Sequence, residues 1–284
     1  MRYGRGIWAI TASVVLATAL SGARATDAKF PDWEGQWART EGAQFDPSKP
    51  PGLPQKPPLT AEYQAIWEAY LRESDAGGQN YNPQARCIPG GMPRMMIAYQ
   101  PLEFIITPAT TFVVVSGRNE FRRIYTDGRD WPHNVAPSLS GYSIGHWSDD
   151  GGDGRYTMLE AETRNFRGPR LIDASGIPLD QDNQTVVKER IHLDKADANV
   201  LRDDITVVDN ALTRPWTVTR SYHRVRNPTW VEDVCDEGNQ WVFIGGETYM
   251  RGPGGLLMPT AKDEPPPDLK YFKKPEAPPK AQAQ

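Results

Sequence analysis

Short apolar or alternating runs, separated by turn signals, fill the chain from Pro101 to Val242. An alternation of apolar and polar residues with a period of two is typical of strands with one buried face. The pattern predicts strands at Glu103–Thr107, Thr111–Ser116, Phe121–Thr126, Tyr142–Trp147, Tyr156–Phe166, Thr185–Leu193, Val200–Val208, Trp216–Val225 and Trp230–Cys235, to which Gln240–Ile244 would add a tenth. No long helix interrupts these runs, which favours a mostly β fold, either a sandwich or a barrel. We expect an antiparallel calycin-like (lipocalin-like) barrel of about nine to ten strands.

One helix is expected at residues 60–73, where Thr60 is a good N-cap. Four large side chains in this stretch recur at helical spacing and form one apolar face: Tyr63, Ile66, Trp67 and Tyr70. This face should pack on a sheet or plug an opening of the barrel.

The segments outside the strands divide the chain further. Residues 26–58 are rich in Pro and Gly, which predicts an extended arm that lies on the domain with Trp33 and Trp37 as its anchors. Residues 59–258 would form a single barrel domain. Residues 259–284 are rich in Pro, Lys and Ala and are expected to be a disordered tail.

The first 25 residues have the pattern of a secretory signal peptide. Arg2 and Arg5 precede an apolar run from Ile7 to Leu20, and a small-x-small cleavage site ends at Ala25. The alternative is a membrane anchor, but the run is short for a span and no second segment of about 20 apolar residues follows. We therefore expect a periplasmic or secreted bacterial protein with no membrane span after cleavage.

Charge and cysteine content narrow the expected partners. The formal net charge of −4 becomes −7 once the three arginines of the leader are removed. An acidic protein of this kind is a poor match for nucleic acid or for an anionic membrane surface. The two cysteines, Cys87 and Cys235, should form a disulfide in an oxidising compartment, since they lack the spacing and the neighbouring histidines of a metal site.

Four strands place an ionisable residue on the same face as their apolar side chains. These residues are Arg123, Glu189, Arg220 and Glu232. A single buried charge is very costly, so the four should pair with one another or with a ligand. They could line a pocket, or they could form structural ion pairs, such as Glu189 with Arg220, that brace a filled core.

The pocket interpretation predicts that the protein binds a small apolar or aromatic ligand. The four charges would orient its polar end, and the lining would come from Tyr125, Glu162, Trp216, Tyr222 and Trp230. A second hypothesis is a lyase, dehydratase or isomerase without a cofactor, in which Glu189 or Glu232 is the general base and Arg220 stabilises an oxyanion. A third is an envelope protein that contacts another protein through its arm and tail. No cofactor is expected, and the sequence identifies no protein partner.

Other motifs give weaker evidence for a catalytic or metal-binding function. His133 lies in a polar loop and could act as a general acid or base, although a surface loop histidine is the plainer interpretation. No HExxH or similar spacing of metal ligands is present, so no metal is expected, and the chain has neither a P-loop nor a GxGxxG motif.

Two further patterns resemble metal sites. The positions of Asp149, Asp153, Gly154 and Glu160 fit an EF-hand loop, but Gly151 stands where an Asp or Asn is expected, which favours a hairpin turn. A cluster of thioethers, Met92, Met95 and Met96, could bind Cu(I), but adaptable packing is the commoner use.

The run Arg122–Arg129 (RRIYTDGR) resembles a signature of a large group of exported bacterial proteins of uncharacterised function. Further runs match the same group in order: Pro57–Thr60, Cys87–Pro89, Met92–Met96, Gly141–Trp147 (GYSIGHW), Glu162–Phe166 (ETRNF) and Arg214–Thr217 (RPWT). The resemblance covers roughly residues 30–245 and implies an exported, barrel-like domain without an assigned reaction. The group usually places a histidine earlier in the loop, as Gly-Arg-x-His-Pro, so the position of His133 departs from that pattern.

Overall fold

The computed structural model describes residues 29–40, 57–75, 87–97, 100–116, 120–173, 175–229 and 235, together with three short strands between residues 241 and 258. The predicted signal peptide, the predicted tail and most of the run Trp230–Cys235 lie outside the described residues.

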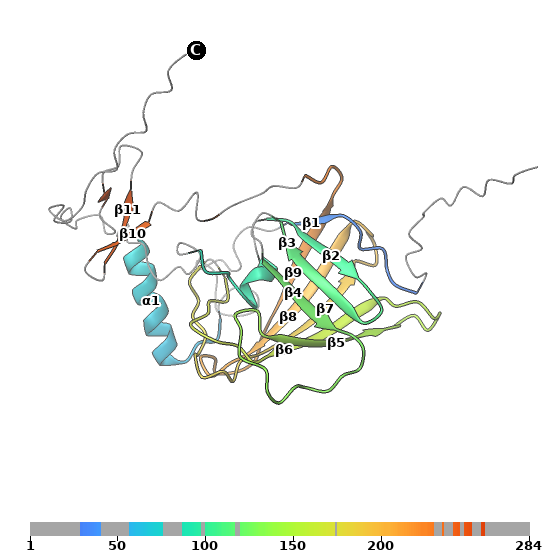
Figure 1. Ribbon diagram of the computed structural model, residues 1–284, viewed down its shortest axis with the longest axis horizontal. Coiled ribbons are helices and arrows are strands. Elements are labelled where there is room, and N and C mark those ends of the chain that lie inside the picture. Colours follow the sequence, from blue (N-terminus) through green and yellow to red (C-terminus); the bar gives the residue numbers. More distant parts are fainter. Residues whose placement is uncertain are drawn as a thin grey trace, which may run out of the picture.

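Nine strands close into a barrel in chain order (Figure 1). They are β1 (Gln36–Arg39), β2 (Leu102–Ile106), β3 (Thr110–Val115), β4 (Glu120–Tyr125), β5 (Tyr142–Ser148), β6 (Met158–Arg164), β7 (Val186–Leu193), β8 (Val200–Val208) and β9 (Trp216–Val225). The expectation of a mostly β barrel with one α-helix is confirmed. The barrel is not wholly antiparallel, however, because β4 and β5 pair in parallel through Ile124 and Tyr125. A parallel pair needs a long connection that returns the chain to the end of the sheet at which the first strand began, and the loop between these strands supplies it.

The strand that closes the barrel comes from the segment expected to be an extended arm. Residues Gln36–Arg39 pair with β9 on one side and with β2 on the other. Trp33 and Trp37 are fully buried, so their predicted role as anchors is confirmed. No strand was predicted in this segment, and the short strand found here satisfies the backbone groups at two sheet edges at once.

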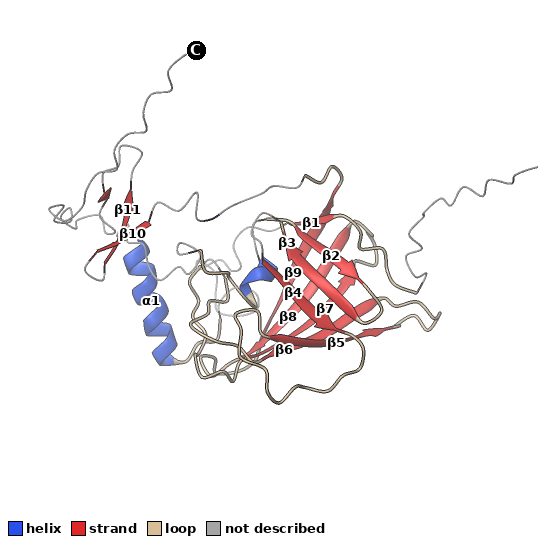
Figure 2. Cartoon of the chain, in the orientation of Figure 1, coloured by secondary structure: helices blue, strands red, loops and turns tan. Residues whose placement is uncertain are grey.

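One end of the barrel is covered by a buried 3₁₀ turn and by loops that contact the helix (Figure 2). The turn, η2 (Arg94–Ile97), is wholly buried. Met92, Met95 and Met96 are buried in the core, and the sulfur of Met92 accepts a hydrogen bond from Arg122 at 3.0 Å. These contacts are those of packing residues.

The helix α1 (Ala61–Asp75) has the N-cap that the sequence predicts. The hydroxyl of Thr60 accepts a hydrogen bond from the backbone N–H of Tyr63 at 3.4 Å. Trp67 is buried, and its indole N–H donates to the carbonyl of Ser175 at 3.0 Å. Ile66 is 48% exposed, so the buried face is narrower than expected. The helix contacts a loop through Trp67 and Ser175, and a loop offers less apolar surface than a sheet.

Cys87 and Cys235 form the predicted disulfide. The predicted run Gln240–Ile244 appears as β10 (Trp241–Ile244), but it does not join the barrel. It pairs with β11 (Glu247–Arg251), which pairs with β12 (Leu257–Met258), in a separate three-stranded sheet. Among the described residues, no helix is both long and apolar enough to cross a membrane.

Candidate functional site

The barrel interior contains a cluster of buried charges, and two of them are predicted ones. Glu189 of β7 and Arg220 of β9 are 1% and 2% exposed. Arg122 of β4 joins them, since its Nη1 and Nη2 donate to Oε1 and Oε2 of Glu189 at 2.8 and 2.6 Å. Because β5 and β6 separate β4 from β7 in the sheet, this two-pronged ion pair reaches across the barrel interior.

Arg123 does not belong to this cluster, contrary to the prediction. It lies on the outer face of β4, where its guanidinium sits 5.1 Å from the ring centre of Phe121 and 5.7 Å from that of Phe112. Phe121 is itself 50% exposed. The inversion has a physical reason: inside the barrel, Arg122 meets a carboxylate, and outside it, Arg123 covers two aromatic rings.

Asp203 of β8 is a buried carboxyl group that the sequence reasoning missed. It is 0% exposed, and it lies directly opposite Arg220 in the register of β8 and β9. Within the described part of the chain, neither of its oxygens forms a hydrogen bond. Burial, together with the neighbouring Glu189 carboxylate, raises the pKa of Asp203 well above its ordinary value. The alternation that identified Glu189 would also have found Asp203, which shares a face with Leu201 and Ile205.

The other predicted pocket residues divide between the inside and the outside of the barrel. Trp216 and Tyr222 are buried inside, and the Tyr222 hydroxyl donates to the carbonyl of Met96. Tyr125 and Glu162 lie on the outer side of the barrel, and His133 is in an exposed loop. Trp230 and Glu232 lie outside the described residues.

A hollow of about 920 Å³ lies on the outer face of strands β5 to β9, beside the loop that follows β4. The polar and aromatic residues of its lining that face outward are Arg129, Trp131, His146, Glu160, Glu162, Arg164, Lys188, Arg190, Asp204, Thr206 and Thr217. Strand register arranges most of these residues in two rows across the sheet. One row runs His146, Glu160, Arg190, Asp204, and the other runs Glu162, Lys188, Thr206, Thr217. Opposite charges therefore face each other on adjacent strands, which stabilises the pairing.

The cations of the hollow project further into solvent than the carboxylates. The side chains of Lys188 and Arg190 are 59% and 55% exposed, whereas Glu160 and Glu162 are 35% and 24% exposed. Glu160 contacts Nε2 of His146 at 2.7 Å and Nε of Arg190 at 3.4 Å. Glu162 pairs with Arg164 on its own strand. A molecule that enters the hollow meets positive charge first.

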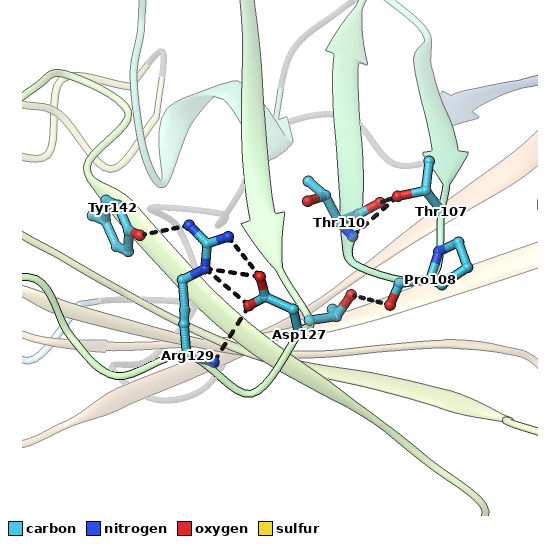
Figure 3. Close-up of polar contacts among 7 residues, drawn as sticks. Thr107, Pro108, Thr110, Asp127, Arg129 and Tyr142 are labelled. Carbon is cyan, nitrogen blue, oxygen red and sulfur yellow. Dashed lines mark hydrogen bonds and ion pairs between the residues drawn. The ribbon is translucent and has the colours of Figure 1, made fainter.

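The loop beside the hollow is held by Arg129 (Figure 3). Its Nε and Nη2 donate to Asp127 at 2.9 and 2.6 Å, and its Nη1 donates to the Tyr142 hydroxyl at 3.3 Å. The same guanidinium lies 3.8 Å from the ring centre of Tyr125, which stacks on Tyr142. The hydrogen bonds from Arg129 lower the pKa of Asp127 to about 2. The loop therefore has a defined position at neutral pH, although Asp127 and Arg129 were not predicted as site residues.

Trp131 follows in the same loop and forms an aromatic wall of the hollow. The Arg164 guanidinium lies 4.7 Å from its ring centre, and the Tyr142 ring lies 6.2 Å away. The arrangement combines flat apolar surface with charged donors, which is the usual composition of a site for a small organic molecule.

The EF-hand pattern at residues 149–160 forms a hairpin turn. The Asp149 carboxylate accepts backbone N–H groups from Gly151, Gly152 and Gly154, at 3.1, 2.7 and 2.7 Å. Glu160 lies on β6 and contacts His146 and Arg190 instead. Within the described part of the chain, no three His, Cys, Asp or Glu side chains are grouped so as to hold a metal ion.

Comparisons with known proteins assign no family to the chain. No protein-family model matches it, and none of the curated proteins matches it significantly.

Proposed function

We propose that the protein binds a small organic ligand in the hollow on the outer face of β5 to β9. The carrying observation is the hollow itself, about 920 Å³ in volume, where charged side chains of adjacent strands converge beside Trp131. Sites for small molecules usually have volumes of about 300–1,000 Å³ and combine an aromatic wall with a few placed polar groups. An aromatic ligand with a polar end suits this lining.

The interior cluster is better suited to holding the barrel together than to binding a ligand. Arg122 and Glu189 satisfy each other through two hydrogen bonds, and both are almost completely buried. Trp216 and Tyr222 are part of the same packed core. In this proposal, Glu189 and Arg220 keep the interior position predicted for them but serve the fold, and the ligand occupies the opposite face of the sheet.

Catalysis with Glu189 as the general base is a less favourable hypothesis than ligand binding. Protonation of Glu189 would leave the Arg122 charge buried beside a neutral group, and an uncompensated buried charge is strongly destabilising. The disulfide and the predicted leader support export to the periplasm or the medium, where such a protein would meet small solutes.

Native mass spectrometry of the protein recovered from the periplasm of a bacterial host tests the proposal. A retained ligand would appear as a mass excess that denaturation removes. Thr217→Trp should abolish the excess, because Thr217 lines the hollow and the bulk of a tryptophan there would obstruct its polar end.

His223→Trp is the matched control. It lies on the same outer face of β9, six residues and roughly 20 Å further along the strand, outside the lining. Loss in Thr217→Trp alone supports the proposal. Retention in both variants would place the ligand elsewhere and refute it. If no excess is seen and no solute of a metabolite panel stabilises the wild type against heat, the binding function is also refuted.

A further inference from the structure

We infer that the ligand of the outer hollow is an aromatic carboxylate, whose acid group is bound by Lys188 and Arg190 of β7. The inference rests on the proposed function, and it names the chemical class of the ligand. It starts from the placement of these two cations on the sheet, because both face the hollow from one strand.

Lys188 and Arg190 are separated by one residue, so their Cα atoms are roughly 7 Å apart and their side chains point the same way. The closest carboxylate atom to the Lys188 ammonium is Oε2 of Glu162, at 3.6 Å. The closest to the Arg190 guanidinium is Oε1 of Glu160, at 3.4 Å. Among the described residues, neither cation has a contact that meets hydrogen-bond geometry, so their donors remain available to a ligand.

The acidic side chains around them each have a partner of their own. Glu160 contacts His146 at 2.7 Å, and Glu162 pairs with Arg164. Asp204 accepts a hydrogen bond from the Thr219 hydroxyl at 2.5 Å. The carboxylates balance the charge of the hollow, while the exposed cationic ends offer two sets of donors to an anion. A carboxylate can accept hydrogen bonds from both sets of donors, because arginine and lysine form strong charge-assisted hydrogen bonds with carboxylate oxygens.

A third donor lies next to Lys188. The hydroxyls of Thr206 and Thr217 are 2.7 Å apart, and Thr206 is the register partner of Lys188. Whichever hydroxyl donates within this pair, the other keeps its own proton for a ligand oxygen. The polar end of the hollow therefore presents donors from three adjacent strands: β7, β8 and β9.

The aromatic part of the ligand is inferred from Trp131, which belongs to the same lining. Trp131 carries the Arg164 guanidinium at 4.7 Å, and guanidinium planes stack well on aromatic rings. A ring of the ligand can pack on this wall while its carboxylate reaches β7. The two halves of the lining thus match one molecule with a flat apolar body and a single negative end.

The test uses 2-naphthoate as the probe and 2-naphthamide as its neutral analogue, each titrated into the mature protein by calorimetry. The wild type should bind naphthoate at least about tenfold more tightly than naphthamide. The double variant Lys188→Gln/Arg190→Gln should remove this preference and leave the naphthamide affinity unchanged. Because both side chains are more than half exposed, the variant should fold, which circular dichroism checks.

The matched control is Arg155→Gln/Lys195→Gln, which removes the same two charges from exposed positions outside the lining. It should bind naphthoate like the wild type. Equal affinity for the two probes, or equal losses in the two double variants, would overturn the inference. The binding function would still stand if Thr217→Trp abolished binding of both probes. If neither probe bound in the millimolar range, the inference would be overturned, and the mass-spectrometric test would decide the binding function separately.

Discussion

Replacement of Asp203 by Asn gives the sharpest test of the charged barrel interior. The carboxyl group is 0% exposed and, among the residues that the structure describes, neither oxygen has a hydrogen-bond partner. Burial and the Glu189 carboxylate raise its pKa, while Arg122 and Arg220 act in the opposite direction. The net rise means that the folded protein holds a proton on Asp203 at pH values where the unfolded chain has lost it.

The sign of the pH effect follows from this difference. Above the unfolded pKa of about 4, the folded state binds more protons than the unfolded state, so raising the pH lowers the free energy of unfolding. For one proton, the slope approaches about 1.4 kcal/mol per pH unit and ends once the pH passes the raised, folded pKa. Asn carries no such proton, so Asp203→Asn should gain stability relative to the wild type as the pH rises from 4.

Urea unfolding at intervals of one pH unit between 4 and 8 measures the difference. The other buried acids with raised pKa values, Asp173 and Asp209, are present in both proteins and cancel in the comparison. Asp204→Asn, which removes a carboxylate from the outer face next to Asp203, controls for the change in net charge. A stability difference between Asp203→Asn and the wild type that stays constant over this range would refute the reasoning. The two arginines would then outweigh burial.

Three further predictions concern the fold. Arg122→Met or Glu189→Leu alone should each lower the free energy of unfolding by about 3–5 kcal/mol, because each leaves a buried charge unpaired. The double variant should recover much of this loss, and equal losses in the single and double variants by urea unfolding would contradict the prediction. Gly141→Ala should destabilise the folded protein by at least about 1 kcal/mol, because φ of Gly141 is +68° and a Cβ there would lie 2.7 Å from a backbone carbonyl oxygen. An unchanged melting temperature would argue against this strain. Cys87→Ser/Cys235→Ser should lower the free energy of unfolding by up to about 5 kcal/mol, because the disulfide joins residues 148 positions apart. Equal midpoints of urea unfolding for the wild type with and without reductant would contradict this prediction.

Strand positions could be predicted from the sequence because alternation is a local property. The runs Val200–Val208 and Trp216–Val225 appear as strands with the same bounds. Alternation also placed Glu189 and Arg220 on the inner face, and the structure confirms both. Local pattern could not show that Gln36–Arg39 closes the barrel, since a four-residue strand is stabilised by its two neighbours and not by its own composition.

The face of β4 shows why the candidate site was harder to predict than the fold. Phe121 and Tyr125 suggested an inner face that would include Arg123, yet the buried face contains Glu120, Arg122 and Ile124. Two consecutive arginines leave the alternation ambiguous, because either can be the buried one. The choice is decided by a carboxylate on β7, 67 residues away in the chain.

The outer hollow is likewise a product of tertiary structure. The residues of the hollow alternate with core residues along β5 to β9. In the sequence of any one strand, they have the ordinary pattern of a solvent-facing side. Only the register of these strands places Lys188, Arg190 and Thr206 together, and only the position of the β4–β5 loop sets Trp131 beside them.

The amino-acid sequence by itself determined the mostly β class, the helix with its N-cap and the inner placement of Glu189 and Arg220, since these depend on periodicity over a few residues. Tertiary structure alone decided that Arg122 and not Arg123 is buried, that Asp203 faces Arg220, and that a hollow forms outside the barrel. These features depend on the free energy of pairing charges between distant strands, and a local pattern does not contain the identity of the partner.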